Sequence, residues 1–536
     1  MGALNSRRMF MAIDDDEDSR SRIEDTSEDS DTLDSDSDYG EHFAAMLRNL
    51  INSGQLLLQS GEEDYEFPAP RRAPKIKVKP DTSMLDRSEF VILTKQACGL
   101  LEPKRNNISV NNVACFLENR ESGVYRGSNF TRRVKCKISN QYIPNEMVVA
   151  LENSTGKVFC GIFSPDGNTF LTASQDRHIR LYNSKDCSYG LLKSVRARDV
   201  GWSIIDVAFS PDGEHFVYST WSPSLHMCPV NGTSDHQEPL SLLNTNRRFC
   251  VFSVVFSSDG KELVCGANDG CLYIYNIEGK KRTLKIMAHE YDINSVLFAD
   301  NTSHIIYSGG DDGLVKVWDR RTLQDRNAKP VGLLAGHMDG ITYIDSRGDG
   351  RHLISNSKDQ SIKLWDVRVF SNDAAANESL KAVRNQPWDY RWQGVPKELY
   401  QNQKLEGDTS VMTYRGHVVS KTLIRARFSP AETTGQRFIY TGCGFGRVVI
   451  YDALTGKIVK QRKGHMACVR DVSWHPTRNE ILSSSWDSLV GKWVYCKSAA
   501  LLEKQEEKAE RKPLRRSARL AALRQREQAD TSTSGN

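Results

Sequence analysis

The sequence predicts an all-β fold, a propeller of seven blades flanked by charged ends, and three recurring features carry this prediction. Short runs of alternating apolar and polar residues recur along the chain, and each ends in an aromatic residue. Asp stands six positions before five of these six aromatic residues. Asp-Gly turns and Gly-His pairs recur in the same phase, so several independent features share one period.

The period is about 42–47 residues, measured between the closing aromatic residues. These are Tyr182, Tyr275, Trp318, Trp365, Tyr451 and Trp493. The gap of 93 residues between the first two contains a weak repeat at Val200–Val230, in which Ser222 replaces the Asp and no aromatic residue follows. The count is therefore seven, with repeats beginning near Val158, Ile204, Phe252, Ile293, Ile341, Ile424 and Val469.

A Gly-His pair, a turn, an Asp and a closing Trp-Asp at this spacing resemble the WD repeat. The resemblance implies that His, Asp and the aromatic residue of each blade form a buried hydrogen-bonded framework. The residues expected in that role are His337, His417, His465, Asp176, Asp269, Asp312, Asp359, Asp487 and Trp493. The second repeat and the sixth, where Phe445 replaces the Asp, should be the looser blades.

Closing the ring requires one strand from outside the last repeat, because the chain becomes charged and helical after Val494. A closed ring removes the free sheet edges that otherwise favour aggregation. We expect an N-terminal segment to supply this strand, either Arg133–Ile138 or Met147–Leu151.

The parts outside the repeats differ sharply in composition. Residues 1–41 include an acidic tract poor in apolar residues, which predicts disorder. Residues 42–60 predict an amphipathic helix, with Phe43, Met46, Leu47 and Leu50 on one face. That face could bind a partner's groove or pack on the propeller itself. Residues 61–130 are expected to be a linker and irregular lead-in to the propeller at 131–496, and residues 497–536 a basic tail, helical and then disordered.

Several functional classes are disfavoured by what the sequence lacks. There is no run of apolar residues long enough for a membrane span, and the 12 cysteines include no CxxC pair. No nucleophile elbow, phosphate-binding glycine loop or HExxH motif occurs. We therefore expect no catalytic residues, no metal and no cofactor. Basic segments at Arg71–Lys79 and Arg511–Arg519 resemble nuclear-import signals, which predicts a protein of nucleus and cytoplasm.

The gap of 86 residues before Tyr451 contains an insertion at residues 371–414. It includes Trp388, Arg391 and Trp392 in the sequence WDYRW, without the alternating strand that precedes the other WD pairs. We predict a loop or short helix on one face, whose exposed tryptophans could anchor a partner.

Two consecutive repeats end in Trp318-Asp319-Arg320-Arg321 and Trp365-Asp366-Val367-Arg368. This doubled WDxR box resembles that of the substrate receptors of cullin-four RING ubiquitin ligases. Segments at 197–213, 266–275, 332–349, 388–393 and 465–476 extend the resemblance over about residues 85–495.

The resemblance implies that Arg321 and Arg368 dock the propeller on the adaptor, damage-specific DNA-binding protein one, with help from the helix at Phe43–Ile51. It also implies that the chain selects protein substrates for ubiquitin transfer, without a direct role on nucleic acid. Two alternatives stay open. The arginines could bind only the turns of their own blades, or the chain could be a chromatin or RNA scaffold that binds peptides through its propeller and phosphate through its basic tail.

Overall fold

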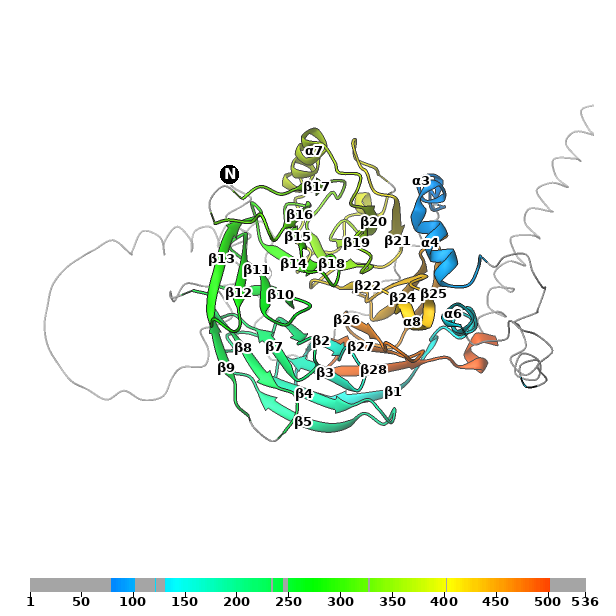
Figure 1. Cartoon of the computed structure of the whole chain (residues 1–536). Helices are drawn as coiled ribbons and strands as arrows, with labels where there is room; N and C mark the ends of the chain where they lie inside the picture. Colours follow the sequence, from blue (N-terminus) through cyan, green and yellow to red (C-terminus); the bar gives the residue numbers. More distant parts are fainter. Residues whose placement is uncertain are drawn as a thin grey trace, which may run out of the picture. The chain divides into compact units, whose positions relative to one another are not determined.

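The computed structural model describes residues 79–101, 121, 131–232, 235–243, 249–325, 328–401 and 403–501. All of them belong to one compact unit, residues 73–536. Within it the chain forms seven antiparallel sheets of four strands each, arranged around a centre (Figure 1). The predicted seven-bladed propeller is confirmed.

The blades follow one another along the chain, and the first strand of each lies innermost. Blade 1 contains β2 (Val158–Phe163), β3 (Thr169–Ser174), β4 (His178–Asn183) and β5 (Gly190–Arg196); blade 2 contains β6 (Asp206–Phe209), β7 (His215–Ser219), β8 (Ser224–Pro229) and β9 (Glu238–Ser241). Blade 3 contains β10 (Val251–Phe256), β11 (Glu262–Ala267), β12 (Cys271–Asn276) and β13 (Lys281–Met287); blade 4 contains β14 (Ile293–Phe298), β15 (Ile305–Gly310), β16 (Val315–Asp319) and β17 (Gly332–Leu334); blade 5 contains β18 (Ile341–Ser346), β19 (His352–Ser357), β20 (Ser361–Asp366) and β21 (Met412–Arg415). Blade 6 contains β22 (Ala426–Phe428), β23 (Phe438–Thr441), β24 (Arg447–Asp452) and β25 (Ile458–Lys463); blade 7 contains β26 (Val469–Trp474), β27 (Ile481–Ser485), β28 (Leu489–Val494) and, from the N-terminal side of the chain, β1 (Glu146–Asn153). Each innermost strand contacts the next, and β26 contacts β2, which closes the ring.

Blades 2 and 6 differ from the others in their innermost strands. β6 has four residues and β22 has three, whereas the innermost strand of every other blade has six. The other five blades also share a bulge near the start of the innermost strand, and blades 2 and 6 lack it. These are the two repeats in which the sequence departs most from the common pattern.

The ring is latched by an N-terminal strand. β1 pairs antiparallel with β28, from Glu146 opposite Val494 to Asn153 opposite Leu489. The second of the two candidate segments, Met147–Leu151, therefore supplies the missing strand. The first candidate, Arg133–Ile138, is wrong, because it lies in the helix α6 (Arg132–Ser139). That helix packs on α8 (Ala431–Thr434), where the Cys136 thiol contacts the carbonyl oxygens of Ala431 and Glu432.

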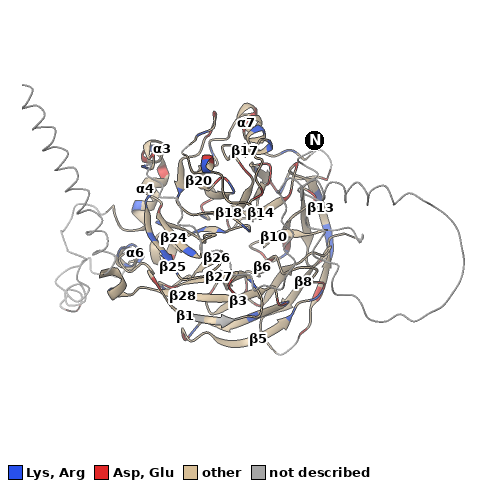
Figure 2. Cartoon of the chain, turned by 180° about the vertical axis from the view of Figure 1, so that it is seen from behind, with Lys and Arg blue, Asp and Glu red and all other residues tan. Residues whose placement is uncertain are grey.

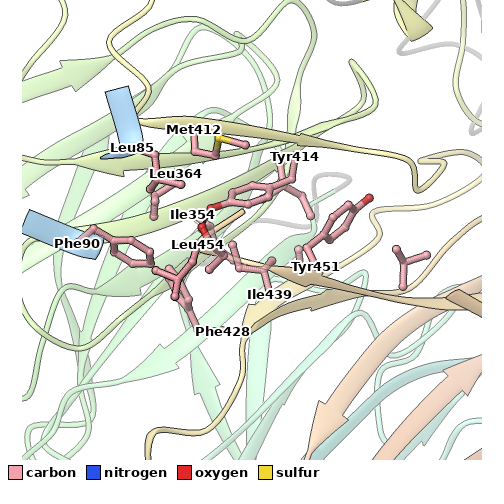
Figure 3. Packing of buried hydrophobic residues seen from close by; sticks show 14 of the residues in the cluster. Leu85, Phe90, Ile354, Leu364, Met412, Tyr414, Phe428, Ile439, Tyr451 and Leu454 are labelled. Atoms are coloured by element: carbon pink, nitrogen blue, oxygen red, sulfur yellow. Dashed lines mark hydrogen bonds between the residues drawn. The ribbon is translucent and has the colours of Figure 1, made fainter. Parts of the chain in front are cut away.

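Two short helices ahead of the latch pack on the propeller. α3 (Ser83–Arg87) leads into α4 (Glu89–Ala97), and α4 lies beside β24 and β25 in both views (Figures 1 and 2). Leu85, Phe90 and Val91 are buried in one cluster with residues of blades 5 and 6, including Phe428 and Leu364 (Figure 3). Burying an aliphatic or aromatic side chain of this size stabilises by about 1.5–3 kcal/mol. The expectation of an irregular lead-in at 61–130 is therefore wrong for this part, whose apolar side chains meet their partners only in the folded ring.

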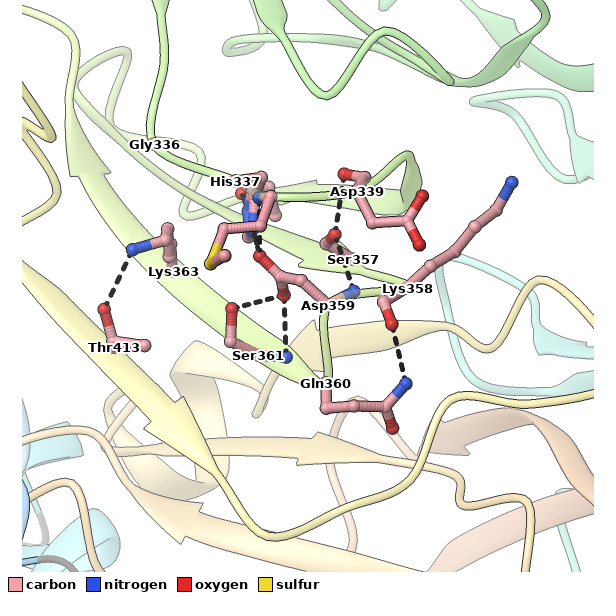
Figure 4. A network of polar contacts seen from close by, with 12 residues as sticks. Gly336, His337, Asp339, Ser357, Lys358, Asp359, Gln360, Ser361, Lys363 and Thr413 are labelled. Carbon is pink, nitrogen blue, oxygen red and sulfur yellow. Dashed lines mark hydrogen bonds and ion pairs between the residues drawn. The ribbon is translucent and has the colours of Figure 1, made fainter. Parts of the chain in front are cut away.

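A framework Asp caps the turn between the second and third strands in five blades. Asp359 Oδ1 accepts a hydrogen bond of 3.0 Å from the backbone N–H of Ser361 (Figure 4). The same bond to the residue two positions later recurs in the other four, at Asp176, Asp269, Asp312 and Asp487. In blade 2 the Ser222 hydroxyl takes the place of the carboxylate and accepts from Ser224 at 3.3 Å.

The histidine that completes the framework is present in three of the described blades. In blade 5, His337 Nδ1 lies 2.9 Å from Asp359 Oδ2, and the Ser355 hydroxyl connects His337 Nε2 to Trp365 Nε1. Blades 4 and 7 repeat this set with His289, Asp312, Ser308 and Trp318, and with His465, Asp487, Ser483 and Trp493.

The expectation that every blade has this set is wrong. Asp176 is paired with Arg180, and Asp269 accepts from the Tyr273 hydroxyl and from Lys285. In blade 6, His417 Nδ1 lies 3.0 Å from the Tyr451 hydroxyl, because no carboxylate is available there. Neighbours on the adjacent strands satisfy the polar groups that histidine would otherwise meet.

The insertion of blade 5 connects β20 to β21 and contains α7 (Asp373–Arg384) and the 3-10 helix η2 (Lys397–Tyr400). Asn372 caps α7 by accepting from the Ala375 backbone N–H. Residues 412–414 belong to the outer strand β21, so the predicted insertion ends about three residues too late. None of the described helices is long and apolar enough to cross a bilayer.

Candidate protein-docking surface

The two WDxR boxes lie at equivalent ends of neighbouring blades. β16 ends at Asp319 and β20 ends at Asp366, and Asp366 pairs with His352 at the start of β19. This end of the strands defines one face of the propeller, which we call the arginine face. The opposite face carries the starts of the innermost strands and the turns that the framework aspartates cap. Arg321 and Arg368 therefore lie on one face, one blade apart.

Arg321 forms a paired contact with the aspartate of its own box. Its Nε donates to Asp319 Oδ1 at 2.9 Å and its Nη2 donates to Oδ2 at 2.7 Å. These hydrogen bonds, together with one from the Arg321 backbone N–H, lower the pKa of Asp319 to about 2. The side chain of Arg321 is nonetheless 61% exposed, and no described residue accepts from its Nη1. The guanidinium is thus held in one orientation while one edge stays available to a partner.

Arg368 forms the same pair and a second one. Its Nε lies 3.0 Å from Asp366 Oδ1 and its Nη2 lies 2.6 Å from Oδ2. Its Nη1 donates to Glu89 Oε1 at 3.3 Å, and Arg351 Nη2 lies 2.5 Å from Glu89 Oε2. Glu89 is the first residue of α4, so this helix is tied to the box of blade 5. The side chain of Arg368 is 49% exposed.

An exposed apolar strip accompanies the two boxes. Val369 and Phe370 follow Arg368 directly, and both are exposed, as is Val331 just ahead of β17. The Phe370 ring lies against Gly332 in β17, where a Cβ would overlap it. Residues from the end of the blade 5 box thus reach the outer strand of blade 4. Neither Phe370 nor Glu89 was predicted from the sequence as part of this surface. An apolar pair directly after a box arginine was the signal available for Phe370.

The third sequence of this kind, at 388–391, lies on the opposite face. Arg391 Nε and Nη2 contact Asp389 at 3.0 and 2.7 Å, as in the other two boxes. Trp388 is buried and its Nε1 donates to Asp339 Oδ2 at 3.1 Å, just ahead of β18. The Tyr390 carbonyl accepts from the backbone N–H of Lys421, which precedes β22.

The prediction of exposed tryptophans in the insertion is therefore wrong for Trp388, because Asp339 and the loops of blades 5 and 6 enclose it. Trp392 is 73% exposed, as expected of a partner anchor. The remaining residues predicted to bind the adaptor, Phe43, Met46, Leu47 and Leu50, lie outside the described residues. Trp318 and Trp365 are fully buried framework residues, so they support the boxes from beneath and do not form the surface.

One group among the described residues has the donor spacing of a cation site. Carboxylate and imidazole atoms of Asp212, Glu214 and His215 lie within 4.8 Å of one another on the turn between β6 and β7. Asp212 is already committed to the Ser210 hydroxyl and the Glu214 backbone N–H. These bonds account for the group as a capped turn.

Comparison with known proteins agrees with the repeats of the fold. The family described as WD domain, G-beta repeat, matches residues 146–183, 237–276, 280–319, 328–366 and 456–493. These five segments end with the third strands of blades 1, 3, 4, 5 and 7. The three inner strands of blades 2 and 6, the blades with the short innermost strands, lie outside the matched segments. The fold and the repeats make this chain a WD-repeat propeller.

Proteins that are similar to this chain over most of its length identify its family within the WD-repeat propellers. A DDB1- and CUL4-associated factor 11 homolog of Caenorhabditis elegans is 38% identical over 462 residues, which cover 81% of this chain and 80% of the relative. The homolog of the same name from Caenorhabditis briggsae is 38% identical over 406 residues, 72% and 71% of the two chains. The LEC14B protein of Lithospermum erythrorhizon is 41% identical over 391 residues, 71% and 81% of the two chains. The chain belongs to the family of DDB1- and CUL4-associated factor 11 homologs.

Proposed function

We propose that this chain is the substrate receptor of a cullin-four RING ubiquitin ligase and docks on the adaptor DDB1 through its arginine face. The observation that carries the proposal is the pair Arg321 and Arg368, oriented by their own aspartates, exposed, and one blade apart in a member of this family. Guanidinium groups fixed in this way suit carboxylate or carbonyl acceptors on a partner, because their donors form a rigid fork.

The apolar strip strengthens the proposal. Interfaces concentrate binding energy in a few side chains, often arginine or aromatic, surrounded by contacts that exclude water. Phe370, Val369 and Val331 supply such contacts beside the two arginines. In this proposal the receptor positions substrates and takes no part in the chemistry of transfer. It acts in the nucleus and the cytoplasm, and its substrates bind on the face opposite the boxes, where the insertion exposes Trp392.

The test is to recover the intact chain from cells and to quantify DDB1 with it, in comparison with Arg321→Ala/Arg368→Ala. An interface arginine of the hot-spot kind costs about 2 kcal/mol or more on truncation, so the double variant should lose more than about 100-fold in affinity. Arg320→Ala is the matched control, since Arg320 lies beside Arg321 but is paired with Glu262 across to blade 3. Circular dichroism checks that each variant is folded.

Three outcomes separate the hypotheses. Loss of DDB1 from the double variant alone supports docking through the boxes. Equal recovery by all variants would show that the boxes are not the dock and would move the search to residues 42–60. Absence of DDB1 with the intact chain would contradict the receptor. In that case, salt-dependent nucleic-acid binding that is lost on deleting residues 503–536 would favour the scaffold alternative.

A further inference from the structure

A cavity lies at the edge of the propeller, away from the two boxes. Its volume is about 110 Å³, well above the roughly 10–15 Å³ that one water molecule needs. Three parts of the chain line it: the segment that leads into α3, the end of the insertion, and the outer strand β21. The wall includes Gly456, in the turn between β24 and β25 of blade 6. The cavity therefore lies where the N-terminal segment meets blades 5 and 6.

The lining is rich in cations. It contains the four basic residues Lys79, Lys363, Lys404 and Arg415, and the single acidic residue Asp81. Lys363 is only 3% exposed and is neutralised by the buried Asp408, with its Nζ 2.6 Å from Oδ2. Hydrogen bonds from Ser83, first from its backbone N–H, lower the pKa of Asp81, and the Lys404 ammonium lowers it further. After these pairings the cavity keeps a surplus of positive charge.

The uncharged polar groups of the wall can also donate. Thr413 and Ser410 present hydroxyls on the side of Lys363, with Thr413 Oγ1 3.2 Å from the ammonium (Figure 4). Gln403 adds an amide to the wall.

Arg415 donates through Nη1 to the carbonyls of Asp359 and Leu399, while its Nε is buried without a partner among the described residues. A buried donor that finds no acceptor is costly and rare in a native structure.

We infer that this cavity binds a phosphate group. Phosphate oxygens accept hydrogen bonds and carry charge, which matches a wall of ammonium, guanidinium, hydroxyl and amide donors. The group could be free phosphate or the phosphate of a modified side chain, since the chemistry of recognition is the same. A phosphate bound here would also connect Lys79, ahead of α3, to the insertion and β21.

The experiment titrates the full-length chain with inorganic phosphate by calorimetry at low ionic strength, where exposed charges are least screened. A second arm uses a blocked Gly-phosphoserine-Gly peptide, with its serine counterpart as the blank. Lys404→Glu reverses an exposed charge of the wall and should weaken binding at least tenfold. Lys397→Glu is the matched control, because it makes the same charge change in η2, outside the lining. Arg415→Gln is a second test in the deeper wall, with its folding checked by circular dichroism.

The outcomes are distinct from those of the adaptor test, because neither Arg321 nor Arg368 lines the cavity. Binding of inorganic phosphate alone assigns the site to the free anion, and tighter binding of the phosphopeptide assigns it to a modified side chain. Both support the inference when Lys404→Glu weakens the binding and Lys397→Glu does not. No binding in either arm, or the same loss with both glutamate variants, overturns it.

Discussion

The same WDxR sequence occurs three times in this propeller, twice on the arginine face and once on the opposite face. In all three, the arginine Nε and Nη2 form a pair of hydrogen bonds with the aspartate two positions earlier. The surroundings differ. The arginine side chain is 61% and 49% exposed at 321 and 368 but 17% exposed at 391.

The box therefore fixes a local turn, and its position in the tertiary structure decides whether it is available to a partner. At the ends of β16 and β20 the box is presented to solvent beside an apolar strip. In the insertion, by contrast, the Trp388 indole bonds to Asp339 and the Lys358 ammonium lies 4.2 Å from the centroid of the Tyr390 ring, so the box fastens the insertion to the propeller.

Trp388→Ala should give the largest change, a loss of about 3–5 kcal/mol in the free energy of unfolding, as for other buried tryptophans. The substitution leaves a cavity and removes the hydrogen bond to Asp339. Urea denaturation measures it. Trp392→Ala is the matched control, because this exposed neighbour should change stability by no more than about 0.5 kcal/mol. Similar small losses for both would show that the third box does not fasten the insertion.

Arg321→Ala and Arg368→Ala, made singly, should differ in their effect on adaptor affinity. Nη1 of Arg321 has no acceptor among the described residues, so Arg321→Ala should cost about 2 kcal/mol of binding free energy, roughly 30-fold in Kd. Nη1 of Arg368 already donates to Glu89, so Arg368→Ala should cost only about 1 kcal/mol of binding free energy. Titration of each purified variant with DDB1 measures both values. An Arg391→Ala variant with the same loss would contradict the assignment of docking to the arginine face.

The repeats could be predicted from the sequence because strand alternation and turn residues are local features that recur with a fixed period. The sequence offered Met147–Leu151 as one of two candidates for the latch strand, and it identified the boxes at 318–321 and 365–368. It could not decide which WDxR sequence is exposed, since the motif and its internal hydrogen bonds are the same at 318–321 and 388–391. Burial of Trp388 depends on Asp339, 49 residues earlier in the chain.

The different partners of Asp176 and Asp269, and the lead-in helices, could not be predicted for a related reason. Asp176 and Asp269 carry the expected cap, but their second partners are Arg180 and Tyr273 on the following strand, and several such partners satisfy the same carboxylate equally well. α3 and α4 have five and nine residues, too few for their apolar pattern to be persuasive without the surface that buries it.

Mildly acidic pH should leave the ion pairs of the three boxes intact while it lowers the stability of the fold. Hydrogen bonding to arginine lowers the pKa of Asp319 to about 2 and holds the pKa of Asp366 and Asp389 below the usual value against the effect of burial, so the three ion pairs persist at pH 5. Burial lowers the pKa of His417 to about 3, below its unfolded value of about 6.5.

The unfolded chain then binds one more proton at His417 than the folded chain between these two pKa values. Stability from this residue is complete above about pH 6.5 and falls with decreasing pH, by up to about 1.4 kcal/mol per unit. Urea denaturation at pH 7 and pH 5 measures the slope. His417→Gln, which keeps polar groups near Tyr451 and Asn356, should be less stable at pH 7 but should show a flatter slope. An unchanged slope would contradict the assignment to His417.

Glu89→Gln should give the smallest effect, and it tests whether the contact with Glu89 is what makes Arg368 differ from Arg321. Exposed ion pairs contribute about 0–1 kcal/mol, so the variant itself should change stability little. Because Glu89 no longer competes for Nη1, the cost of Arg368→Ala measured in this background should rise by about 0.5 kcal/mol toward that of Arg321→Ala. The cost of Arg321→Ala should not change, since Arg321 has no contact with α4 among the described residues. A double-mutant cycle on adaptor affinity gives both differences. Additive effects at Glu89 and Arg368 would show that α4 is fastened to blade 5 without influencing how the box presents its arginine.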